Sequence, residues 1–155
     1  MGVGEIKWLD HMTDMEIEVT GFSLEDAFEN AGLATEETMT DTSQVTTQTI
    51  MKFDLTGIDE PALLYAFLDK IISIMDSDGM VFNHFECDIW QEIEDSVQMF
   101  RLLVRGYGEV FDSSRHESRT AIKAPTFHSM SIRSENETLR FTSCWIYRLA
   151  YDQKE

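Results

Sequence analysis

The chain has 155 residues, 43% of them hydrophobic, and a net charge of −17 from 29 acidic and 12 basic side chains. This composition excludes global disorder. The chain contains no run of about 18 apolar residues, the length that a membrane-spanning helix needs. An acidic surface repels phosphates, so direct nucleic-acid binding is not expected, whereas a divalent cation or a basic partner protein would be attracted. The N-terminus lacks the pattern of a secretory signal, so we expect a cytoplasmic or nuclear protein.

The first third of the chain predicts a strand, a helix and a second strand. Apolar and polar residues alternate through "MEIEVT" (15–20), which is the period of a half-buried strand. Ser23 followed by Asp26 resembles a capping box, and the apolar spacing after it predicts a helix over 23–38. Residues 45–55 are rich in β-branched side chains and are predicted to form a strand.

A second helix is the clearest element. Pro61 suits a first helical position, with Asp59 or Glu60 as the cap. One apolar stripe follows, formed by Leu63, Leu64, Phe67, Leu68, Ile71, Ile72 and Met75. "DSDG" at 76–79 ends the helix, because Gly79 can adopt the left-handed conformation.

The second half of the chain predicts strands. They run from Met80 to Ile93, over 97–107, over 120–132 and over 138–152, with a hairpin turn at 94–96, a loop at 108–118 and a turn at 133–137. We therefore predict one α+β domain over residues 1–155, in which a largely antiparallel sheet of about six to eight strands packs with two α-helices.

Candidate chemistry centres on "DHMTD" at 10–14, which contains two carboxylates and a histidine. Carboxylates bind hard cations, and Asp10 and Asp14 could meet Asp152 if the first and last strands are neighbours. A catalytic pair, a metal site and a solvated loop all remain open at this point. The four histidines stand alone in their segments, which is more typical of structural residues. Cys87 and Cys144 have no metal-binding or redox spacing and are expected to be buried.

Five ordered segments resemble the archease family over nearly the whole chain. They are "LDHMTDMEIEVTGFSLEDAFENAGLA", "ALLYAFLDKIISIMDSDGMVFNHFE", the loop "GEVFDSSRHES", the strand "TAIKAPTFHSMSI" and a last strand that ends "AYD". They match the family's HTAD-like start with its SLEEAF helix entry, its DGLVF-like turn, its D-x-x-RH loop, its KAxTYH-like strand and its acidic C-terminus.

The resemblance implies a non-enzymatic protein cofactor of an RtcB-type RNA ligase in tRNA splicing, which promotes guanylylation of the ligase and multiple turnover. RNA would be contacted only indirectly. The family's cation, calcium, would be held here by Asp14, Asp152 and the backbone oxygen of Gln153. Further candidates for partner contact or support of the site are Asp10, His11, Asp112, Arg115, His116, Lys123 and His128, although the loop residues could equally form an internal network.

Two departures from the family pattern affect the site. The start reads "HMTD", but Asp14 keeps its spacing from His11, so the ligand role is retained. The chain continues past Gln153 with Lys154 and Glu155, so Gln153 can offer the metal only its backbone carbonyl and no terminal carboxylate. Two alternative functions remain: a chaperone or specificity modulator of an RNA-modifying enzyme such as a tRNA methyltransferase, and a metal-dependent hydrolase using Asp14 and Asp152 with His11 or His128 as the base.

Overall fold

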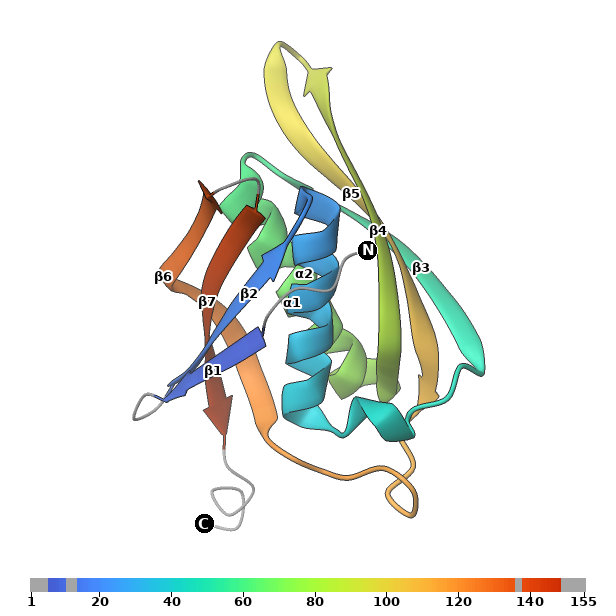
Figure 1. The fold of residues 1–155 in the computed structure, drawn as a ribbon. Helices are drawn as coiled ribbons and strands as arrows, with labels where there is room; N and C mark the ends of the chain where they lie inside the picture. The colour runs from blue at the N-terminus through green and yellow to red at the C-terminus, as the bar shows by residue number, and fades with distance from the viewer. Residues whose placement is uncertain (1–5, 11–13, 136–137, 149–155) are drawn as a thin grey trace.

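Two α-helices lie between two antiparallel β-sheets, as Figure 1 shows. The computed structural model describes residues 6–10, 14–135 and 138–148. One sheet has the order β1-β2-β7-β6 and the other has the order β3-β5-β4. Within the described ranges the strands are β1 (Ile6–Asp10), β2 (Asp14–Gly21), β3 (Thr49–Gly57), β4 (Met80–Glu94), β5 (Val97–Val110), β6 (Ala121–Glu135) and β7 (Thr138–Arg148). The helices are α1 (Leu24–Met39) and α2 (Glu60–Asp78), with a short 3-10 helix at Thr42–Gln44.

The predicted α+β class is confirmed, but the strands form two sheets instead of one. The reason lies in the helices, which are apolar on more than one side. Helix α1 packs on β2 and β4, and α2 packs on β3 and β6, so each helix contacts both sheets. A helix that is buried on two sides needs a layer on each side to exclude water.

Local signals positioned both helices. The Ser23 hydroxyl accepts a hydrogen bond from the backbone N–H of Asp26 at 3.1 Å, which confirms the predicted N-cap of α1. Asp59 caps α2 by accepting from the N–H of Ala62 at 2.8 Å. Gly79 ends α2 with φ 66°, in the left-handed region expected of a glycine cap. Neither described helix is long and apolar enough to span a membrane.

The strands differ from the prediction mainly at their ends. Strand β1 was not predicted, β3 begins at Thr49 instead of residue 45, and β5 extends to Val110. The β4–β5 turn lies where it was expected. Asp95 and Ser96 there have φ values of 50° and 67°, the positive angles of a turn that matches the twist of a hairpin. The end of the predicted last strand, 149–152, and the centre of the preceding turn lie outside the described residues.

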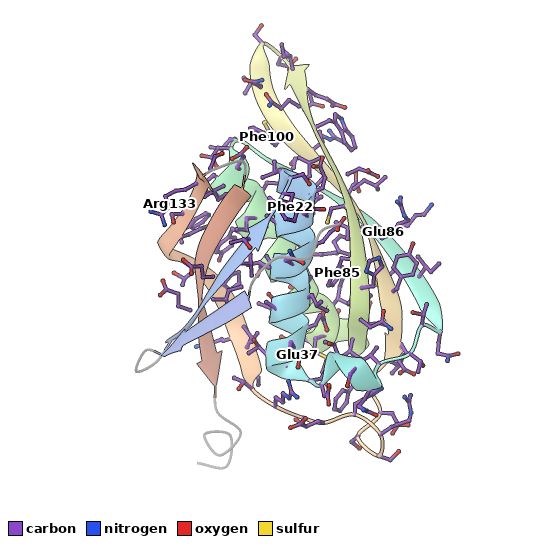
Figure 2. All side chains as sticks on the ribbon, in the orientation of Figure 1. Phe22, Glu37, Phe85, Glu86, Phe100 and Arg133 are labelled. Atoms are coloured by element: carbon purple, nitrogen blue, oxygen red, sulfur yellow. The ribbon has the colours of Figure 1, made fainter. Side chains whose placement is uncertain are left out.

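The core lies between the helices and the two sheets. The predicted α2 stripe is confirmed, because Leu64, Phe67, Leu68 and Ile71 are all fully buried. The Phe67 ring stacks on that of Phe28 at 6.0 Å between centroids. Figure 2 shows that the side chains of β4 alternate between its two faces: Phe85 points towards the helices and Glu86 points away from them.

Cys87 lies on the inner face of β4. Its side chain is buried as predicted, and burial raises the pKa of its thiol, so it is not a reactive nucleophile. The side chain of Cys144 lies outside the described residues.

Candidate functional site

The register of the four-stranded sheet brings the start of β2 next to the end of β7. Asp14 is paired with Ile146, and Asp10, at the end of β1, is paired with Met15. The pairing of β2 with β7 therefore meets the condition that the first and last predicted strands be neighbours. The side chains of Asp10 and Asp14, and all of His11, Asp152 and Gln153, lie outside what the structure describes, so their arrangement around a cation stays a prediction.

Lys123 lies at the same end of this sheet. On β6, Ala124 is also paired with Ile146, so Asp14, Ile146 and Ala124 form one row across β2, β7 and β6. The register shifts between Ile122 and Ala124, which makes Lys123 the irregular residue beside that row. Its side chain is exposed. The positive charge of Lys123, next to the predicted carboxylates, would attract an anionic group of a partner. The side chain of His128, farther along β6, lies outside the described part.

Glu109, near the end of β5, organises the loop that carries three of the predicted residues. Its carboxylate is only 6% exposed. It accepts hydrogen bonds from Arg115 Nη2 on Oε1 at 2.5 Å, and from the Thr46 N–H on Oε2 at 2.7 Å. His116 Nε2 lies 2.9 Å from Oε2. The internal network considered from the sequence is thus present for Arg115 and His116, and it is centred on a residue that sequence reasoning missed.

Both ring nitrogens of His116 are engaged. The backbone N–H of Asp112 donates to Nδ1 at 2.8 Å, so Nδ1 is an acceptor and Nε2 carries the hydrogen that is donated to Glu109. The side chain is fully buried, and the ring packs against Phe111 at 5.5 Å between centroids. The described geometry therefore makes His116 a positioning residue of the loop.

Electrostatics reinforce the same arrangement. The Arg115 guanidinium, followed by the N–H of Thr46 and the His116 ring, holds the pKa of Glu109 well below its usual range despite burial. The side chain of Asp112 is exposed and accepts from the N–H and hydroxyl of Ser114, which lowers its pKa. Arg115 keeps 44% of its side chain exposed, beside an open groove between the end of β5 and the start of β3. Of the three predicted residues in this loop, Arg115 and Asp112 are thus the two that a partner could reach.

The following residues fasten the loop to the end of α1. The backbone N–H groups of Arg119 and Thr120 donate to the carbonyls of Met39 and Thr38 at 3.0 and 3.1 Å. Arg119 Nη1 also donates to Glu37 Oε2 at 2.6 Å. Figure 2 labels Glu37 at this end of the helix. The loop is therefore held at both ends, by Glu109 and by α1.

Comparison with known proteins identifies the family. A sequence model of the archease protein family matches residues 7–144. The chain belongs to the archease family. It is 36% identical to the archease of Aeropyrum pernix over 143 residues, which cover 92% of this chain and 93% of that protein. It is also 36% identical to the archease of Sulfolobus acidocaldarius over 137 residues, which cover 87% of this chain and 94% of that one.

Solved structures of archeases share the fold. The solution structure of Methanobacterium thermoautotrophicum protein 1598 superposes with a TM-score of 0.75 at 30% identity, covering 91% of this chain and 97% of that one. The crystal structure of an archease from Thermotoga maritima, described as a possible chaperone, has a TM-score of 0.53 at 18% identity, and it covers 90% and 95% of the two chains. At that identity the second likeness concerns the fold alone.

Among the residues whose side chains are described, no group of three or more His, Cys, Asp or Glu could hold a metal ion. The archease metal residues predicted here fall outside that part of the chain. Glu109 is the residue of the candidate site whose place in the loop network was found only from the structure. A single glutamate at the end of a strand carries no periodic or motif signal, and its role depends on Thr46 and Arg115, which come from two other segments.

Proposed function

We propose that this protein is a non-enzymatic cofactor of an RtcB-type RNA ligase in tRNA splicing, which promotes guanylylation of the ligase and thereby its multiple turnover. The observation that carries the proposal is the archease match over residues 7–144. The sequence resemblance that implied this family also implies the ligase as the partner. We expect the two proteins to meet in the cytoplasm or nucleus.

Net charge supports a basic partner. At −17, the protein would be drawn to the positive surface of an RNA-binding enzyme, and the association should weaken as salt is added. The same charge disfavours direct RNA contact. RNA would therefore be met only through the ligase.

The proposed contact surface is the end of the four-stranded sheet at which Asp14, at the start of β2, pairs with Ile146 near the end of β7. Asp14 and Asp152, with the Gln153 carbonyl, would supply the oxygen ligands that calcium prefers, and β2 and β7 are neighbours as this grouping requires. A bound divalent ion would supply positive charge near a transferred guanylyl phosphate. Asp10, His11, Lys123 and His128 would border this end, and Asp112 and Arg115 would add contacts from the loop.

Guanylylation of the ligase tests this role one step before RNA joining. Labelled guanylate transferred from GTP to the ligase should accumulate faster with the wild-type protein than without it. Asp14→Ala should lose this stimulation, whereas Asp10→Ala, a neighbouring carboxylate outside the proposed ligand set, should keep more of it. Unchanged labelling with a stoichiometric excess of the cognate protein would contradict the proposal.

Co-purification distinguishes the alternatives. Recovery of an RNA ligase supports the proposal, whereas recovery of a tRNA methyltransferase without the ligase would favour a modulator of RNA modification. Hydrolysis of RNA by the purified protein, lost in Asp14→Ala, would instead favour the metal-dependent hydrolase.

A further inference from the structure

Strand β4 is an edge strand, and α1 covers only part of its open side. In the order β3-β5-β4, β4 has one strand neighbour. Two of its outward N–H groups are capped by carboxylates from α1: Phe82 donates to Glu36 at 3.1 Å and Cys87 donates to Glu29 at 2.9 Å. The first half of the edge is therefore closed to an additional strand.

Beyond Cys87 the edge is open. Because N–H directions alternate along a strand, Ile89, Gln91 and Ile93 point their N–H groups to the same side as Cys87, away from β5. Among the described residues, no other strand pairs with this edge, and no backbone carbonyl accepts a hydrogen bond from these three amides. Figure 1 shows the β4–β5 hairpin reaching past the ends of the helices.

Apolar side chains accompany the open edge. Ile93 is 75% exposed and Val97 is 52% exposed, while Trp90 is 40% exposed. Ile89 and Ile93 share the face of β4 that continues from the buried Cys87, whereas Trp90 lies on the opposite face. A strand added here would cover Ile93, which the described residues leave in water.

Charge decides what kind of strand fits. On the opposite face β4 carries Asp88, Glu92 and Glu94, and Asp95 follows in the turn. Arg105 lies 3.8 Å from Asp88. Farther along the strand, Arg101 lies within 3.8 Å of Asp54, Glu92 and Glu94, so one positive charge there faces three negative ones. A second copy of β4 would place these carboxylates beside identical ones, which is destabilising. A strand with lysine or arginine on that face would instead be attracted.

We propose that the edge of β4 from Ile89 to Glu94 binds an extended segment of another protein as an added strand, in which basic and apolar side chains alternate. Its backbone would pair with the outward amides of Ile89, Gln91 and Ile93, its apolar side chains would cover Ile93, and its basic ones would meet Glu92 and Glu94. In Figure 1 this edge lies at the opposite end of the molecule from the start of β2. The inference does not depend on the proposed ligase function.

A synthetic peptide of alternating valine and lysine, about ten residues long, is the probe. We expect it to bind the full chain, more weakly at higher salt, and to protect the amides of Ile89, Gln91 and Ile93 from hydrogen exchange. The matched peptide with glutamate in place of lysine should not bind. No binding of the valine–lysine peptide, or protection confined to other amides, would overturn the proposal.

Two proline variants provide a matched pair. Gln91→Pro removes an amide from the open edge without removing a bond to β5 and should weaken binding about tenfold, since it deletes one backbone bond and disrupts its neighbours. Gln98→Pro removes an amide from the other edge of the same hairpin and should leave binding unchanged. Equal effects of the two variants would contradict strand addition to β4.

A charge reversal keeps the test valid if a proline variant fails to fold. Glu92→Lys combined with Glu94→Lys leaves the backbone intact and should transfer the preference from the lysine peptide to the glutamate peptide. An unchanged preference would refute the charge argument. A dimer of the free chain that Gln91→Pro abolishes would show instead that a second copy occupies this edge.

Discussion

Glu36 on α1 provides a sharp test of the packing between α1 and β4. Its side chain is fully buried, and one carboxyl oxygen accepts from the Phe82 N–H, whereas the other has no hydrogen-bond partner among the described residues. Burial raises the pKa of Glu36 well above its usual value, and the Phe82 N–H offsets this only in part. Glu36→Gln keeps an acceptor for Phe82 and cannot ionise.

The sign of the pH effect follows from that raised pKa. Above the unfolded pKa of about 4.3, the unfolded chain loses the Glu36 proton while the folded chain retains it, so stability falls as pH rises towards the folded pKa. The loss is about 1.4 kcal/mol per pH unit in that interval. Glu36→Gln should therefore be close to wild type at low pH. Its gain relative to wild type should be about 1 kcal/mol at pH ~5 and up to about 4 kcal/mol at pH ~7. Each kcal/mol corresponds to a rise of about 2–4 °C in Tm.

Urea unfolding followed by circular dichroism over this pH range measures the difference. Glu37→Gln is the matched control on the same helix, because hydrogen bonds from Thr42 and Arg119 lower the pKa of Glu37 despite its partial burial. Its substitution should destabilise the protein at neutral pH and lose that effect as the pH falls below the unfolded pKa. A stability difference between wild type and Glu36→Gln that does not change with pH would refute the reasoning.

Three further predictions concern the core, the loop and the proposed metal end. Leu68→Ala should cost about 2–5 kcal/mol, because its fully buried side chain would leave a cavity; an unchanged urea midpoint would contradict the packing of α2. Glu109→Gln should lower stability at neutral pH, and this effect should be lost as the pH falls through the lowered pKa of Glu109. The same variant should speed hydrogen exchange at the backbone amide of His116. An exchange rate equal to that of wild type would show that Glu109 does not hold the loop. Added calcium should raise the Tm of the wild type but not of Asp14→Ala, and equal shifts in both would refute the metal role.

The helices were predictable because their signals are local. Ser23, Asp59 and Gly79 each act within one turn of the helix end that they define, and the α2 stripe repeats with the helical period. The division into two sheets was not predictable in this way. It depends on which strand pairs with which across the whole chain, and alternation within a strand does not identify its neighbour.

The same limit applies to the buried carboxylates. Glu36 and Glu109 look like ordinary surface residues in the sequence, and their burial depends on Phe82, Thr46 and Arg115 from distant segments. At the candidate site, the sequence set only a condition, that the first and last predicted strands be neighbours, and the pairing of β2 with β7 meets it. The roles of individual residues there came from the family resemblance and stay predictions.

The number of ligations completed per ligase molecule tests the central claim most directly. With ligase well below the concentration of RNA substrate, the wild-type protein should convert single turnover into many turnovers and should join no RNA by itself. Asp14→Ala should leave the ligase near one turnover, while Asp10→Ala should retain more of the stimulation. A ligase whose turnover is unchanged by excess wild-type protein, or is fully stimulated by a folded Asp14→Ala variant, would contradict this account.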